Sequence, residues 1–108
     1  KQWSFTSDLS NELLYKFPDK VIMVCREKSG EFKCSLRSSK FKLPKRINEA
    51  LEGLTGYGGG HDYACGACVK VSDFKEFLSR FKKSDEILGK TTSVSGSPIL
   101  TLYSITLG

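Results

Sequence analysis

Three consecutive glycines, Gly58, Gly59 and Gly60, lie directly before His61, the only histidine of the chain. Glycine lacks a Cβ and accepts positive φ, so the amide N–H groups of such a run can turn toward one anion. The imidazole of the following histidine places one more hydrogen-bond donor beside them. The segment therefore predicts a loop that binds a phosphate group through its backbone and through His61.

A second group of anion-binding side chains is expected on a β-hairpin upstream of the glycines. A tight-turn sequence over residues 28–31 separates two runs, residues 21–26 and 32–37, that are rich in strand-forming residues. Two loop residues, Ser29 and Gly30, set the register of the two strands. The predicted cross-strand pairs are Lys28 with Glu31, Arg26 with Lys33, Cys25 with Cys34, and Ile22 with Arg37.

Alternation along the two strands divides their side chains between two faces. The face expected on the core side carries Met23, Cys25, Phe32, Cys34 and Leu36. The opposite face is basic and carries Arg26, Lys33, Ser35 and Arg37. On an isolated hairpin such charges are typical of a solvated face, but the glycine run favours an anion-binding surface. Arg37 lies between the hydroxyls of Ser35 and Ser38, an arrangement that suits a phosphate group.

Four cysteines, Cys25, Cys34, Cys65 and Cys68, allow several interpretations. A Cys₄ zinc site is disfavoured, because only one pair has the C-x₂-C spacing and the other pair lies across a hairpin. The usual burial of cysteine favours free thiols, and a disulfide between the opposed Cys25 and Cys34 is the alternative. Cys65 paired with His61 as a nucleophile lacks a third group that would orient the histidine.

No catalytic cluster is visible in the sequence. The pair His61-Asp62 is similar to the doublet of metal-dependent phosphohydrolases, but those sites need further histidines, which the chain lacks. Acidic residues such as Asp8, Asp19 and Asp73 lie at expected helix starts or turns, where capping explains them. We therefore expect neither a catalytic residue nor a metal ligand on this chain.

Helices and further strands must position these residues. Ser7 or Asp8 is expected to cap a first helix that Pro18 ends, and its apolar side chains are Leu9, Leu13 and Phe17. Pro44 suits the first turn of a second helix, whose apolar stripe comprises Ile47, Ala50, Leu51 and Leu54.

The remaining elements complete one α/β domain. Residues 66–71 predict a strand, and Asp73 with Glu76 predicts a capping box for a third helix. Helical spacing predicts core packing for the stripe Phe74, Phe77, Leu78 and Phe81. An apolar run over residues 99–107 predicts an edge or closing strand. The fold class that follows is a single α/β domain, with a mixed β-sheet containing the hairpin and flanked by about three helices.

Composition narrows the functional classes. The 108 residues suit one domain, and a formal net charge of +5 with a pI near 9.1 suits an anionic partner. No run is long and apolar enough to span a membrane, and no signal peptide is visible, which predicts a soluble, cytoplasmic protein. The chain begins at Lys1 and its only methionine, Met23, lies in an apolar run, which predicts a piece of a longer protein.

Two motifs carry a resemblance to a known family. Residues 58–67, GGGHDYACGA, resemble the GGGH-x-x-A-A-G motif of the DHH-associated domain, first subtype, of the DHH phosphoesterase superfamily. Residues 35–38, SLRS, are similar to the S-x-R-S strand motif of that domain. The resemblance covers residues 20–83. Cys65 replaces the usual alanine, and the resemblance assigns no role to the tail over residues 84–108.

The resemblance implies a two-lobed hydrolase such as the RecJ-like single-strand exonucleases, oligoribonucleases and cyclic-dinucleotide phosphodiesterases. The other lobe of the same chain would carry Asp and His ligands for two manganese or magnesium ions, and this lobe would bind single-stranded nucleic acid or a short oligonucleotide. His61 and Arg37 would bind substrate phosphates, with Ser35 and Ser38 supporting Arg37. Gly58, Gly59 and Gly60 would let the backbone approach the nucleotide.

Two alternatives accompany this interpretation. A non-catalytic nucleic-acid-binding or scaffold module of a replication or repair complex would use the same glycines and basic face without hydrolysis. The editing-associated tail of alanyl-tRNA synthetase has a related glycine-rich motif, but it usually lacks a histidine at the position of His61.

Overall fold

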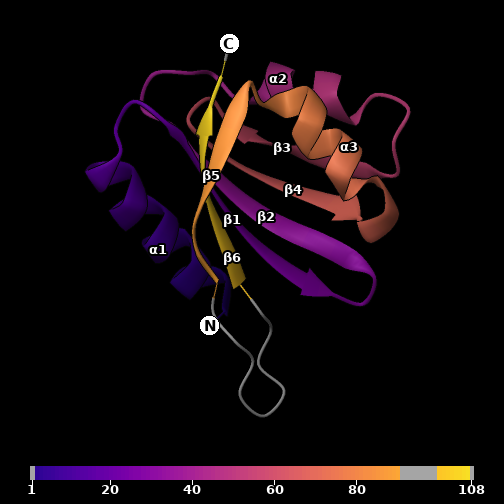
Figure 1. Ribbon diagram of the computed structural model, residues 1–108, viewed down its shortest axis with the longest axis horizontal. Helices are drawn as coiled ribbons and strands as arrows, with labels where there is room; N and C mark the ends of the chain where they lie inside the picture. The colour runs from indigo at the N-terminus through magenta and orange to yellow at the C-terminus, as the bar shows by residue number, and fades with distance from the viewer. Residues whose placement is uncertain (1, 91–99, 108) are drawn as a thin grey trace.

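The computed structural model describes residues 2–90 and 100–107, which form one β-sheet with helices on both faces (Figure 1). The helices are α1 (Gln2–Lys16), α2 (Pro44–Leu51) and α3 (Val71–Phe81). The strands are β1 (Val21–Lys28), β2 (Glu31–Arg37), β3 (Gly56–His61), β4 (Ala64–Lys70), β5 (Ser84–Lys90) and β6 (Leu100–Thr106). Across the sheet their order is β3-β4-β2-β1-β6-β5. The predicted α/β fold with three helices is confirmed.

Neighbouring strands in the described sheet are all antiparallel, whereas a mixed sheet was expected. Helix α2 connects β2 to β3, and helix α3 connects β4 to β5, so each helix joins two strands of the same direction. These same-direction strands are not neighbours, because β4 lies between β2 and β3, and three strands separate β4 from β5. In a simple βαβ unit, the two strands joined by the helix would be parallel neighbours. Here antiparallel strands lie between them, so the sheet contains no parallel pair among the described strands.

The β1–β2 hairpin has the predicted two-residue loop. Ser29 and Gly30 have φ values of 54° and 79°, which is the combination required at the two central positions of a type I′ turn. Cys25 opposes Cys34 and Ile22 opposes Arg37, so the predicted register is confirmed. The sequence pattern thus determined which hairpin side chains share a face.

Helices α2 and α3 cover one face of the sheet and form the main core with it (Figure 1). The residues predicted for the core side of the hairpin pack there. Helix α2 begins at the predicted proline and buries Ile47, Ala50 and Leu51. Helix α3 contributes Phe77 and Phe81, whose ring centroids are 5.8 Å apart. The aromatic stripe is therefore a core element, as expected.

Helix α1 covers part of the opposite face, which we call the outer face. Leu9, Leu13 and Leu14 pack there on Ile22 and Val24, which are fully buried. The prediction of a simply basic outer face is therefore wrong over this part. The predicted pattern considered the hairpin alone, and Ile22 and Val24 alternate with its core residues.

Two predicted helix starts are wrong. Helix α1 begins at Gln2, so Ser7 and Asp8 lie inside it, since residues 2–6 contain no glycine or proline to prevent helix formation. Helix α3 begins at Val71 without a side-chain cap, so Asp73 and Glu76 form no capping box. The Asp73 carboxylate instead accepts a hydrogen bond of 2.8 Å from the backbone N–H of Thr55, and thereby ties α3 to the segment before β3.

The C-terminal segment adds two strands to the sheet. Strand β6 lies between β1 and β5, so the predicted strand exists but is an interior strand, and β5 forms the edge. Its burial follows from its apolar residues Leu100, Leu102 and Ile105. Strand β5 lies in a segment whose serines and charges gave no strand signal. The predicted start of the apolar run, Ile99, lies outside the described residues.

Candidate nucleotide-binding surface

The outer face of the sheet has two unlike halves. In the covered half, helix α1 packs over β1 and β2, and Leu100 and Leu102 of β6 join the same apolar cluster. In the open half, the outer-face positions of β3 and β4 carry small or polar side chains. The open half comprises Tyr57, Gly59, His61, Ala64, Gly66 and Cys68. Among these residues only Cys68 is buried.

The glycine run is a strand and not the predicted loop. Residues Gly56–His61 form β3, an edge strand paired with β4. A Cβ on Gly58 would lie 2.7 Å from Cγ2 of Ile47 and 3.0 Å from the carbonyl oxygen of Gly66. Gly60 has φ of 140°, and a Cβ there would lie 2.6 Å from the carbonyl oxygen of Ala64. These glycines therefore let β3 approach β4 and α2 closely, which explains their presence without a ligand.

Gly59 is different from its neighbours. A Cβ on Gly59 would meet no atom within 4 Å, so packing does not require a glycine at this position. Gly59 is paired with Gly66, and the two leave a patch of backbone without side chains in the middle of the open half. This bare patch is the place where the chain can approach a ligand closely.

His61 and Arg37 lie in one row across the sheet. His61 is paired with Ala64 of β4, and Ala64 is paired with Arg37 of β2. Side chains of directly paired residues project from the same face, so both flank the small side chain of Ala64. With one strand between them, their Cα atoms are about 10 Å apart. The structure thus brings together two residues that lie far apart in the sequence.

Hydrogen bonds hold the Arg37 guanidinium at the border between α1 and the open half. Its Nε donates to Oδ1 of Asn11 at 3.1 Å, and its Nη1 donates to the carbonyl oxygens of Leu36 at 2.9 Å and Cys65 at 3.4 Å. Partial burial lowers the pKa of Arg37, although the guanidinium keeps its charge at neutral pH. The cation is therefore oriented by the fold and not by a ligand.

Ser35 and Ser38 form hydrogen bonds away from the Arg37 guanidinium. Ser35 is buried, and its Oγ accepts a hydrogen bond of 3.2 Å from Ser10 of α1. The Oγ of Ser38 accepts from the backbone N–H groups of Lys40 at 3.2 Å and Phe41 at 2.8 Å. In these bonds the two serines position α1 and the turn after β2, and so support Arg37 only through the backbone around it.

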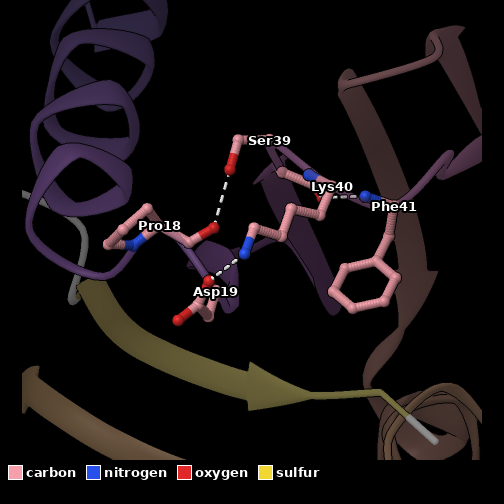
Figure 2. A network of polar contacts seen from close by, with 6 residues as sticks. Pro18, Asp19, Ser39, Lys40 and Phe41 are labelled. Carbon is pink, nitrogen blue, oxygen red and sulfur yellow. Dashed lines mark hydrogen bonds and ion pairs between the residues drawn. The ribbon is translucent and has the colours of Figure 1, made fainter.

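The turn after β2 is also attached to the segment between α1 and β1. Figure 2 shows Ser39 donating to the carbonyl oxygen of Pro18 at 2.6 Å, and an ion pair between Lys40 and Asp19. The Lys40 ammonium lowers the pKa of Asp19, although both side chains are exposed to solvent. These contacts join the segment before β1 to the segment after β2, on either side of the β1–β2 hairpin.

The sequence matches the family model of the DHHA1 domain over residues 6–84, which is most of the chain. The chain belongs to the DHHA1 family. A comparison with curated proteins found no match. The match includes both motifs and all of the open half, and it ends at Ser84, where β5 begins. This DHHA1 domain is thus assigned to the DHH superfamily of phosphoesterases, whose members combine such a domain with a catalytic DHH domain.

The cysteines of the DHHA1 domain lie on both faces of the sheet. Cys25 and Cys34 are buried thiols in the core, with their sulfur atoms 2.8 Å apart, and Cys65 also faces the core. Cys68 lies on the outer face in a row with Tyr57 and Lys33. The four sulfur atoms therefore do not converge on a common site.

Neither a thiol nucleophile nor a metal centre is found in the described part of the domain. The Sγ of Cys65 donates to the carbonyl oxygen of His61 at 3.0 Å, and burial raises the pKa of this thiol, which keeps it protonated. Among the described residues, no three His, Cys, Asp or Glu side chains are placed to bind one metal ion. No described helix is long and apolar enough to span a membrane.

Two residues of this surface were not singled out from the sequence. Tyr57 is an aromatic side chain with 71% of its surface exposed, and it lies on the same face as Gly59 and His61. Alternation along residues 57–61 would have revealed it if the glycine run had been interpreted as a strand. Asn11 gave no signal, because its contact with Arg37 depends on how α1 packs against the sheet.

Proposed function

We propose that this DHHA1 domain is the substrate-binding lobe of a metal-dependent DHH-family phosphoesterase that acts on single-stranded nucleic acid or short oligonucleotides. The open half of the outer face would bind the phosphates, and a catalytic domain of the same protein would supply the manganese or magnesium ions and the hydrolytic step. The observation that carries the proposal is the row of His61, Ala64 and Arg37 beside the bare backbone of Gly59 and Gly66.

The proposal is supported by two hydrogen-bond donors that a phosphate group can reach without meeting a large side chain. An oriented guanidinium and an exposed imidazole flank a position where only a methyl group covers the sheet. Charge-assisted hydrogen bonds to phosphate are worth about 1.5–3 kcal/mol each, so two such groups supply useful affinity and specificity for an anion. The net charge of +5 adds a favourable long-range attraction that salt would screen.

In this proposal the chain acts in a reducing, cytoplasmic setting, which its four free cysteines support. Its own residues bind and orient the substrate, and no proton transfer or metal ligation is assigned to them. Ser35 and Ser38 belong to the supporting structure around Arg37, through the contacts with α1 and the turn at residues 38–41.

A binding titration tests the proposal. We expect His61→Ala and Arg37→Ala to weaken binding of a fluorescent single-stranded oligonucleotide about tenfold or more each, because each removes a charge-assisted contact. Lys75→Ala, an exposed lysine of α3 on the other side of the sheet, is the matched control and should bind as the unmodified chain does. Circular dichroism would verify that all variants remain folded. Unchanged binding by both site variants would refute the assignment.

A hydrolysis assay separates an enzyme from a scaffold. In a protein that carries this domain together with a catalytic DHH domain, we expect manganese-dependent hydrolysis of single-stranded DNA or RNA that His61→Ala strongly reduces. Salt-sensitive binding without hydrolysis would instead favour a non-catalytic nucleic-acid-binding or scaffold module of a replication or repair complex.

A further inference from the structure

A hollow of about 290 Å³ lies on the open half, beside the row of His61 and Arg37. The backbone around the Gly59–Gly66 pair forms its floor. Tyr57 and Lys33 line its other end, on either side of Cys68 in the next row across β3, β4 and β2. The hollow therefore combines a flat floor of main chain with one aromatic side chain and one cation.

The place of the hollow relative to the phosphate-binding row is set by strand geometry. The row of Gly59 and Gly66 is two residues along the strands from the row of His61 and Arg37, which corresponds to about 7 Å. A single sugar spans such a length between a phosphate group and its base. A nucleotide whose phosphate lies at His61 and Arg37 would thus place its base in the hollow.

Tyr57 is the feature of the hollow that packing does not explain. This residue is 71% exposed, on an edge strand otherwise composed of glycines and His61. The neighbouring Cys68 thiol raises the pKa of Tyr57, so the phenol is neutral at physiological pH. A neutral ring in this position offers a stacking surface next to a floor without side chains.

We propose that this hollow binds an unpaired nucleobase, stacked on Tyr57, of the nucleotide whose phosphate contacts His61 and Arg37. This inference rests on the proposed function and makes it more specific. The recognised ligand is a base-bearing single strand and not any polyanion, because stacking requires a π-face that a sugar phosphate lacks. A base paired in a duplex has both faces covered and is excluded. Lys33 would contact the base edge or an adjacent phosphate.

The test compares two short fluorescent probes of equal length and charge, an oligothymidylate and an oligomer of abasic deoxyribose phosphates. The unmodified chain should bind the base-bearing probe about tenfold more tightly. Tyr57→Ala should abolish this preference and leave the affinity for the abasic probe unchanged, and Tyr57→Phe should retain it. Tyr15→Ala removes a tyrosine of α1 that is 89% exposed and serves as the matched control, with the preference retained.

The outcomes distinguish the inference from the proposed function. Equal affinity of the unmodified chain for the two probes, with both lost in His61→Ala, would overturn the base site and leave phosphate binding standing. A preference that survives Tyr57→Ala would also overturn it. Failure of the unmodified chain to bind either probe, or binding that His61→Ala and Arg37→Ala do not affect, would overturn both.

Discussion

The covered and open halves of the outer face belong to the same sheet, but they carry opposite kinds of residues. In the covered half, Ile22 and Val24 are fully buried beneath the leucines of α1. In the open half, the equivalent positions of β3 and β4 carry Gly59 and Gly66 in the same row as Val24. Large aliphatic side chains attract a helix because burial of their surface is favourable, and glycines offer no such surface.

This difference shows how one sheet face can be stable and still present a binding surface. The apolar cluster of the covered half holds α1 in place, and α1 in turn orients Arg37 through Asn11. The open half then remains accessible at the side of this helix, with exposed His61 and Tyr57 around bare backbone. Stability and recognition are thus assigned to adjacent halves and not to the same residues.

The largest expected effect comes from the covered half. Ile22→Ala removes a β1 side chain that is fully buried beneath α1, and should lower the free energy of unfolding by about 2–5 kcal/mol. Urea denaturation followed by circular dichroism would measure it. Ile87→Ala, on edge strand β5 with 60% exposure, is the control and should have little effect. Similar losses for the two variants would mean that the covered half is not a packed core.

A smaller effect distinguishes two glycines in one strand. Gly58→Ala places a methyl group against Cγ2 of Ile47 and should lower the free energy of unfolding by about 1–3 kcal/mol. Gly59→Ala meets no atom within 4 Å and should leave stability unchanged or slightly higher, since alanine loses less conformational entropy than glycine.

The same two variants also distinguish a glycine that is needed for packing from one that is needed for ligand binding. Gly59→Ala fills part of the bare floor and should weaken oligonucleotide binding, measured by fluorescence anisotropy, although the domain stays folded. Equal destabilisation by the two alanines would contradict the distinction between a packing glycine and a floor glycine.

The smallest effect concerns Tyr103, which packs against the main core on the side of the sheet opposite the outer face. Burial, with lesser contributions from Cys25 and Cys34, raises the pKa of Tyr103 to about 12. The neutral phenol is therefore favoured by folding, so its contribution to stability is complete below pH 10, the ordinary pKa of tyrosine, and is lost as the pH rises through 12. Tyr103→Phe should show a shallower decrease in the free energy of unfolding between pH 10 and 12. Identical slopes in urea titrations would show that Tyr103 is not protected by burial.

Much of the fold followed from local patterns in the sequence. The Ser29-Gly30 turn fixed the register of β1 and β2, because a two-residue loop leaves only one pairing and alternation then assigns the faces. Pro44 and the phenylalanine stripe of α3 predicted two helices and their buried sides for similarly local reasons. The two motifs that contain Arg37 and the glycine run indicated the DHHA1 family, which the match over residues 6–84 confirms.

What the sequence could not show depends on contacts between distant segments. Glycines are typical of loops, so only the pairing with β4 and the approach to Ile47 make residues 56–61 a strand. Strand β5 likewise gains its conformation from pairing with β6 and not from its own residues.

The sequence by itself determined the hairpin, its register, the aromatic core stripe and the family. The tertiary structure alone decided that α1 covers one half of the outer face, that His61 and Arg37 share a row, and that Tyr57 borders a hollow next to them. The physical reason is the distance along the chain over which each interaction acts. Turn geometry and side-chain alternation act between neighbouring residues, whereas strand order and helix packing depend on burial summed over the whole chain.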